Sequence, residues 1–175
     1  MGASGRRFES YHPDFLLIMT FINYLKINSS AIIEWSKCLH EEETDMFQTG
    51  ATIKPLLNPI FKREDLLNKE LLCLDNVRQI TYINLFPGCE VCEHTHEYAS
   101  YFVMENKQPI YFPAETNYKT THFVLESNPN AYFVFDDKIY TWERGKFDEL
   151  EVIYTPHYAV NPGPTNVRLL YFDYY

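Results

Sequence analysis

The sequence has few basic residues, and this shortage limits the partners that the protein can bind. Its 15 Lys and Arg residues stand against 24 Asp and Glu residues, so the formal net charge is -9 at pH 7. Nucleic-acid binding needs clustered Lys and Arg side chains that neutralise phosphates. We therefore expect no nucleic-acid partner.

Cysteines and long apolar segments are also scarce. The four cysteines, Cys38, Cys73, Cys89 and Cys92, are too few and too scattered for a disulfide framework. A reducing compartment, by default the cytoplasm, is the simplest interpretation. The longest apolar run, FLLIMTFINYL at 15–25, has about half of the roughly 20 residues that a membrane-spanning helix needs. We expect neither a membrane span nor a signal peptide, because acidic residues precede this run.

Glycine is rare, whereas aromatic residues are abundant. The 175 residues include 6 Gly but 14 Tyr and 13 Phe. A chain of this length has room for one domain with a buried core. Aromatic and β-branched side chains suit the pleated surface of a sheet, and here they are concentrated in the second half of the chain. We therefore expect one folded domain with strands in that half.

The first part of the chain has helical patterns. Asp14 is a suitable N-cap for a helix that closes near 28–30, where Asn-Ser-Ser stands. Residues 31–40 predict a second, shorter helix. A third is predicted at 63–74, where leucines recur at helical spacing.

From about residue 79 the pattern becomes strand-like. Short apolar and aromatic runs lie at 79–86, 97–104, 109–112, 121–126, 131–137, 149–155 and 167–175. Turn sequences such as PGCE, NPNA, ERGK and NPGPTN separate them. Many short strands with such turns are typical of an all-β sandwich or barrel.

The stretch GCEVCEHTHEYASYF at 88–102 concentrates potential metal ligands. Alternate residues of a strand face the same way, so Cys92, His94 and His96 are predicted to project from one surface and Cys89 to point away. His157, in YTPHYAVN, is the best candidate for a further ligand from a distant strand. Imidazoles with open coordination positions suit iron, zinc or copper.

Other interpretations of these residues stay open. A closed structural zinc site would need all four of Cys89, Cys92, His94 and His96. The predicted orientation of Cys89 weakens that possibility. A redox Cys-x-x-Cys normally opens a helix, whereas strand-like sequence follows this one. The histidines could also be ordinary polar residues that bind no metal.

Three segments together resemble the core of the Fe(II)/2-oxoglutarate-dependent oxygenases, and most closely the aspartyl/asparaginyl β-hydroxylase branch. They are GCEVCEHTHE, THFVLESNPNAYFVFDDK and RGKFDELEVIYTPHYAVNPGPTNVRLLYFDYY. The most specific part is the Pro-His-x-x-x-Asn element with an arginine about ten residues later. The resemblance covers about residues 80–175. It implies a mainly β fold, a double-stranded β-helix barrel of the jelly-roll or cupin-like kind at 79–175. Composition and the helical patterns add a flexible 1–13 and a helical extension at 14–78 that packs on the barrel.

The resemblance also implies site residues and a reaction. His94 and His157 match iron ligands, Arg168 matches the arginine that binds the distal carboxylate of 2-oxoglutarate, and His122 matches a second basic position near the cosubstrate. His157 and Arg168 flank one turn, so we expect them on paired neighbouring strands. The implied function is an Fe(II)- and 2-oxoglutarate-dependent dioxygenase. It would hydroxylate a C–H of a small-molecule or peptide substrate, an amino acid or a peptidyl Asp or Asn.

The sequence departs from the oxygenase pattern at His96, where most members carry an acidic ligand. Three outcomes are open: His96 binds iron as a third nitrogen ligand, or it swings aside and water takes its place, or the metal site is altered or lost. Thiol dioxygenases on the cupin barrel also use three histidines, and the spacing from Gly88 to His96 matches cupins. Cupins carry a glutamate three or four residues after this histidine pair, but here Ala99 and Ser100 occupy those positions. The alternative functions are therefore a cupin-type three-histidine dioxygenase without 2-oxoglutarate, or a non-catalytic metal-binding module.

Overall fold

The computed structural model describes residues 21–42, 51–58, 61–63, 76–96, 103–105, 108–110, 117–152 and 154–175. The elements in chain order are α1 (Phe21–Ser36), the 3-10 helix η2 (Lys37–Glu42), β1 (Ala51–Asn58), β2 (Phe61–Lys62), β3 (Val77–Leu85), β4 (Cys89–His94), β5 (Val103–Glu105), β6 (Gln108–Ile110), β7 (Lys119–Glu126), β8 (Tyr132–Phe135), β9 (Lys138–Thr141), β10 (Phe147–Leu150), β11 (His157–Asn161) and β12 (Val167–Tyr174). Among the described helices, none combines the length and the apolar character that a membrane crossing needs.

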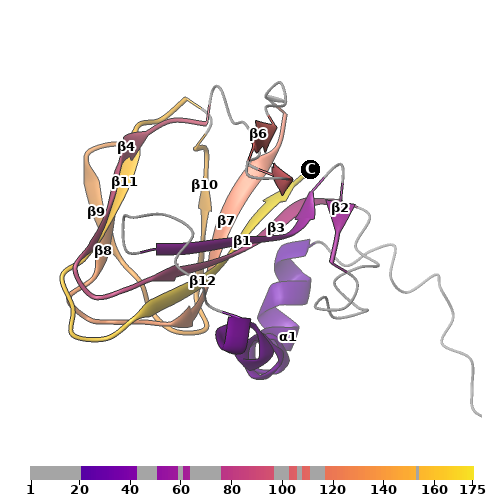
Figure 1. The fold of residues 1–175 in the computed structure, drawn as a ribbon, viewed down its shortest axis with the longest axis horizontal. Coiled ribbons are helices and arrows are strands. Elements are labelled where there is room, and N and C mark those ends of the chain that lie inside the picture. Colours follow the sequence, from indigo (N-terminus) through magenta and orange to yellow (C-terminus); the bar gives the residue numbers. More distant parts are fainter. Residues whose placement is uncertain are drawn as a thin grey trace, which may run out of the picture.

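Two antiparallel sheets face each other (Figure 1). The larger has the strand order β10-β7-β12-β3-β1-β2, and the smaller has the order β4-β11-β8-β9. A separate pair, β5-β6, forms a third small sheet. This arrangement is the mainly β, jelly-roll type of barrel with a packed helix that the sequence predicts.

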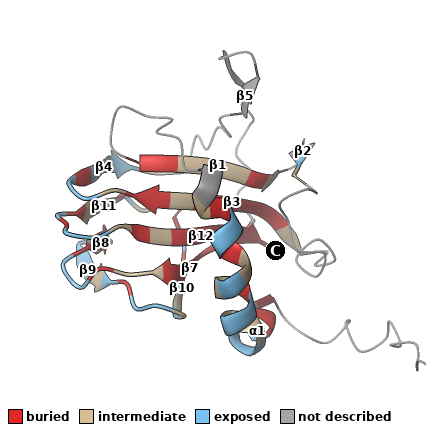
Figure 2. Ribbon diagram, turned by 60° about the horizontal axis from the view of Figure 1, so that its bottom comes forward, coloured by how far each residue is buried: buried red, intermediate tan, exposed pale blue. Residues whose placement is uncertain are grey.

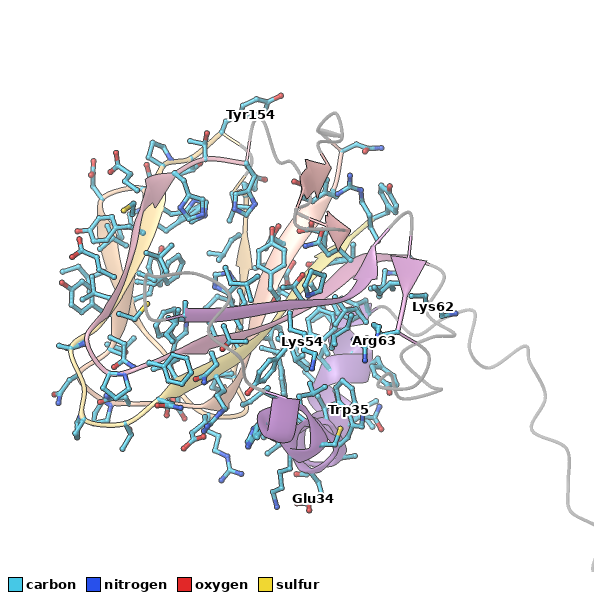
Figure 3. The ribbon with its side chains drawn as sticks, viewed as in Figure 1. Glu34, Trp35, Lys54, Lys62, Arg63 and Tyr154 are labelled. Atoms are coloured by element: carbon cyan, nitrogen blue, oxygen red, sulfur yellow. The ribbon has the colours of Figure 1, made fainter. Side chains whose placement is uncertain are left out.

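The space between the two sheets contains an apolar core, and side chains of both sheets point into it (Figure 3). Its buried members are Ala51, Leu85, Cys89, Val124, Ala131, Phe133, Trp142, Leu150, Val152, Val167 and Leu169. Trp142 stacks on Phe133 with ring centroids 5.9 Å apart and an interplanar angle of 8°. The alternation of inward and outward residues along each strand thus gives the barrel a packed interior.

A second core lies on the outer face of the six-stranded sheet, where α1 packs with one buried face and leaves the other exposed (Figure 2). Leu25 and Ile32, at helical spacing, are both fully covered there. The helix therefore runs on through 28–30, and the prediction that it closes at that point is wrong. Asn28 remains helical with its side-chain amide donating to the Tyr24 carbonyl at 3.0 Å. Burial of the apolar face outweighs the weak helix propensity of Asn-Ser-Ser.

The prediction of a helical extension at 14–78 is also wrong where β1 and β2 lie, because these residues form strands. Six residue pairs place β1 beside β3 in the large sheet, with a register shift between Pro55 and Leu57. A proline cannot donate to a ladder, so it is tolerated at such an irregularity. The third predicted helix, at 63–74, falls almost entirely outside the described residues, as does the start of the first.

A tight hairpin that the sequence analysis did not single out joins β8 to β9. Asp136 and Asp137 both have positive φ, 51° and 57°. Two successive left-handed residues form the type I′ turn that matches the twist of a two-residue hairpin. The run predicted at 131–137 therefore ends as a strand at Phe135, and β9 returns along it.

Candidate metal centre

Three histidines from neighbouring segments of the small sheet meet at one end of the barrel. His94 ends β4, His157 begins β11 directly opposite it in register, and His96 lies two residues beyond β4. The ring centroids of His94 and His157 are 4.3 Å apart, and those of His96 and His157 are 4.9 Å apart. One ligand atom of each ring lies within 4.8 Å of the other two. His94 is exposed and His157 buried, so the cluster extends from the solvent into the barrel.

A β-bulge in β4 brings the histidines to the inner face. His157 pairs with His94 and Ala159 with Val91, so three steps along β4 match two along β11. The extra residue reverses the alternation, which leaves Cys92 exposed while Cys89 is buried in the core. The predicted common face for Cys92, His94 and His96 is therefore wrong for Cys92, and Cys89 points inward. Among the described residues, the cluster that could hold a metal consists of the three histidines.

The spacing of the three nitrogens fits a mononuclear metal ion. Three atoms within 4.8 Å of one another lie at most about 2.8 Å from a common centre, and bonds from zinc to imidazole nitrogen are about 2.0–2.1 Å. Side-chain movements of less than about 1 Å would close the remaining difference. Three neutral imidazoles are the ligand type that iron, zinc and copper accept.

Hydrogen bonds to the other ring nitrogen leave two of the histidines ready to ligate. Nδ1 of His94 lies 2.8 Å from the Cys92 carbonyl oxygen, and Nδ1 of His157 lies 2.9 Å from that of Thr155. A carbonyl oxygen only accepts, so each Nδ1 carries the hydrogen and each neutral ring keeps its lone pair on Nε2. Such bonds orient ligating histidines in metal sites. His96 differs, because its Nδ1 lies 2.9 Å from the hydroxyl of Tyr171.

Burial keeps two of these imidazoles neutral. Burial, followed by the neighbouring histidines, lowers the pKa of His96 from 6.5 to about 3. Burial likewise lowers the pKa of His157 to about 4, against the opposing hydrogen bond to Thr155. Only a neutral imidazole can donate a lone pair to a metal, so the site favours the ligating form.

His122 lies inside the same barrel, on β7. It is 8% exposed, and its ring centroid is 5.6 Å from that of Tyr171 and 5.4 Å from that of Phe133. Burial first, and then the charges of His157 and His94, lower the pKa of His122 to about 3. Its buried Nδ1 has no hydrogen-bond partner among the described residues. His122 thus offers a polar atom to the interior near the three histidines.

Arg168 does not face the histidines. In register it lies opposite Asn84, as Leu170 lies opposite Tyr82, and directly opposed residues share one face of a sheet. Leu170 and Tyr82 belong to the core under α1, so Arg168 is on the outer face, where its guanidinium pairs with Glu126. The expected pairing of the strands that carry His157 and Arg168 is wrong, because β11 and β12 belong to different sheets. The turn between them carries the chain from one sheet to the other.

Three solved structures that resemble this fold are a cupin_2 domain of an XRE family transcriptional regulator from Enterobacter cloacae, KdgF from Halomonas sp. and a predicted oxalate decarboxylase from Thermotoga maritima. The first is 17% identical with a TM-score of 0.43, over 72% of this chain and 97% of that chain. The second is 12% identical with a TM-score of 0.46, over 78% and 89%. The third is 18% identical with a TM-score of 0.40, over 62% and 75%.

These matches are too distant to carry an argument about the site. No protein-family model matches the sequence, and no characterised protein matches it either. Function therefore has to be argued from the geometry of this chain.

Sequence reasoning missed the polar side chains behind His96. Tyr171 and Asp173 lie on β12 with Thr120 on β7, and all three face the barrel interior. A signal was present, because Asp173 is the one acidic residue in the mainly apolar and aromatic run VRLLYFDYY. It also alternates with Leu169 and Tyr171, so a strand would place all three on one face. A buried acid in such a run requires partners.

Proposed function

We propose that this protein is a metal-dependent dioxygenase of the cupin type, with a three-histidine centre that works without 2-oxoglutarate. The observation that carries the proposal is the meeting of His94, His96 and His157, with one ligand atom of each within 4.8 Å of the others. Three ligands on one side of an ion leave its other positions open, as catalytic sites require. Fe(II) is the proposed metal, because imidazoles with open positions suit it and it reacts with dioxygen.

The bound metal would supply the site at which dioxygen and substrate meet. The residues of the chain would hold the ion and bind the substrate. The three imidazoles would hold the ion at the solvent end of the barrel, and the exposed edge of His94 leaves that end accessible. The buried Nδ1 of His122 would form a hydrogen bond to a polar group of a small substrate that enters the barrel.

A 2-oxoglutarate-dependent hydroxylase of an amino-acid or peptidyl substrate is the second candidate. The sequence resemblance favours it, above all the element that runs from Pro156 to Asn161 with Arg168 beyond. The placement of Arg168 on the outer face, paired with Glu126, does not support its role in holding the cosubstrate. A cytoplasmic location, a small-molecule or peptide substrate, and the absence of a nucleic-acid or membrane partner remain proposals.

Metal binding and cosubstrate use test the two candidates. Metal-free protein is titrated with Fe(II) under argon, and we expect one ion per chain. His157→Ala should abolish binding, whereas the matched control His40→Gln should keep it. His40 is half-buried and its ring lies 6.2 Å from that of Tyr82, which belongs to the separate core under α1. The loaded protein is then given oxygen and a panel of small thiols, amino acids and organic acids, with and without 2-oxoglutarate.

We expect oxygen consumption that does not depend on 2-oxoglutarate, no release of succinate, and no change in Arg168→Ala. Succinate formation that is lost in Arg168→Ala would overturn the proposal in favour of the second candidate. Failure of the wild-type protein to bind any of Fe(II), Zn(II) or Cu(II) would leave a non-catalytic module instead.

A further inference from the structure

A buried row of polar side chains leads from His96 to a charged pair inside the barrel. The Tyr171 hydroxyl lies 2.9 Å from Nδ1 of His96 and 3.4 Å from Oγ1 of Thr120. Thr120 donates to Oδ1 of Asp173 at 2.7 Å, and Oδ2 of Asp173 lies 3.7 Å from Nη1 of Arg78. All four residues behind His96 are at most 7% exposed.

The direction of these hydrogen bonds follows from the chemistry of their ends. An ionised carboxylate only accepts, and a threonine hydroxyl has a single hydrogen, which Thr120 gives to Asp173. The Thr120 oxygen can then only accept from the Tyr171 hydroxyl. When the Tyr171 hydrogen goes to Thr120, or to the Asp173 carboxylate with which Tyr171 also bonds, the Tyr171 oxygen accepts from Nδ1–H of His96.

This direction decides which nitrogen of His96 can bind a metal. With the hydrogen on Nδ1, the neutral ring keeps a lone pair on Nε2. Were Tyr171 to donate to Nδ1, the ring hydrogen would sit on Nε2 and block ligation. The tautomers of His94 and His157 are fixed by backbone carbonyls, so His96 alone depends on side chains.

We propose that Asp173, acting through Thr120 and Tyr171, is a positioning residue that fixes the His96 tautomer and so makes His96 the third metal ligand. This inference rests on the proposed metal centre and concerns the position where the resembling oxygenases carry an acid. Asp173 would influence the metal from three hydrogen bonds away without touching it.

A second β-bulge supplies the cation that this arrangement needs. Asp173 pairs with Gln79 but Tyr174 pairs with Val77, so Arg78 is the extra residue of β3. The bulge turns Arg78 inward, beside Asp173 and with its guanidinium carbon 4.6 Å from the centre of the Tyr118 ring. A buried carboxylate is tolerated when a guanidinium pairs with it. The bulge thus places a counter-charge where Asp173 acts as the acceptor at the end of the row.

A matched pair of variants at Thr120 tests the proposal. Thr120→Val keeps the shape but removes the hydroxyl, and Thr120→Ser keeps the hydroxyl. In metal-free protein at neutral pH, imidazole nitrogen NMR reports the tautomer of each histidine. We expect His96 to carry its hydrogen on Nδ1 in wild type and Thr120→Ser, and to lose this preference in Thr120→Val. Zn(II) affinity should fall roughly 10- to 100-fold in Thr120→Val and recover in Thr120→Ser.

The inference is overturned if His96 keeps its hydrogen on Nδ1 in Thr120→Val, or if both variants lose affinity with the tautomer unchanged. Should Thr120→Val fail to fold, Tyr171→Phe replaces it, with the same tautomer readout and the same expected loss. The tautomer is read without metal, so it tests the row of hydrogen bonds even if wild-type protein binds no ion. Failure of metal binding alone would instead count against the proposed function.

Discussion

At the scale of single residues, the carboxyl group of Asp173 shows how burial can outweigh a neighbouring charge. Burial raises its pKa from 3.8 to about 6, although the hydrogen bonds from Thr120 and Tyr171 and the charge of Arg78 all act in the opposite direction. Between these two values the folded chain binds more protons at Asp173 than the unfolded chain does. The free energy of unfolding contributed by this group therefore falls as the pH rises from about 4 to about 6.

Asp173→Asn removes this dependence, so the comparison of the two proteins isolates it. We expect the free energy of unfolding of wild type, minus that of the variant, to decrease as the pH rises through this window. Urea denaturation at several pH values measures the difference. Parallel pH profiles for the two proteins would contradict the raised pKa. The control variant is Asp137→Asn, because Asp137 is exposed and its replacement leaves the row of hydrogen bonds intact. A variant at Thr120 would not serve as a control, because it would alter that row.

At the scale of elements, the hairpin between β8 and β9 is held by two aspartates in a conformation that glycine adopts more easily. A non-glycine residue in the left-handed region raises the free energy of the folded state by about 1–2 kcal/mol, and by less for Asp. Glycine avoids this strain, but it loses more conformational entropy on folding, which costs about 0.5–1 kcal/mol. Asp137, with φ of 57°, is therefore expected to gain stability when replaced by glycine.

Asp137→Gly should raise the free energy of unfolding by up to about 1 kcal/mol. Asp137→Ala also removes the charge but keeps a Cβ, so it serves as the matched control and should give no gain. The contact between Lys138 and Asp136 is present in both variants. An equal gain in both would assign the effect to charge rather than to backbone conformation.

The turn that carries the chain from β11 to β12 depends on the fully buried Asn161. Its amide donates to the carbonyls of Leu85 at 2.7 Å and Thr165 at 2.9 Å, and its oxygen accepts from Asn128 and from the backbone of Gly163. This is the asparagine of the Pro-His-x-x-x-Asn element, so here that residue has a structural role. It fixes the point where the chain leaves the sheet of His157 for the other sheet.

Asn161→Ala leaves several buried groups without partners, each worth about 1–3 kcal/mol. We expect a loss of about 3 kcal/mol or more in the free energy of unfolding, measured by urea denaturation. Asn130→Ala is the matched control, because exposed Asn130 makes one long side-chain bond, of 3.4 Å, to the same turn. Its cost should be below about 1 kcal/mol. Similar losses in both would refute the structural role of Asn161.

Elements differ in how far the sequence predicts them, and the reasons are physical. The strands around Ile80 and Phe172 could be predicted because apolar residues there recur with the period of a strand. The bulges at Cys92 and Arg78 could not, because one extra residue reverses the alternation without any local signal. The prediction that Arg168 lies on a strand paired with that of His157 was wrong for a related reason. A turn in the sequence does not reveal whether the chain re-enters the same sheet or crosses to another, and that is set by tertiary packing.

At the scale of the whole molecule, the metal centre links segments that are 63 positions apart in the printed sequence, from His94 to His157. The unfolded chain cannot hold these imidazoles together, so an ion bound by the three histidines would favour the folded state. By mass action, such an ion would stabilise the folded state. At a free metal concentration of 100 times the dissociation constant, the gain is about 2.7 kcal/mol.

For a protein of this size, such a gain corresponds to a rise in melting temperature of roughly 5–10 °C. Calorimetry of metal-free protein, with and without added Fe(II) under argon or Zn(II) in air, measures the shift. His157→Ala should melt without any metal-dependent shift, while His40→Gln should shift as wild type does. A shift that persists in His157→Ala would mean that the ion binds elsewhere. Because the shift reports binding rather than turnover, it tests the three-histidine centre independently of the substrate and of any cosubstrate.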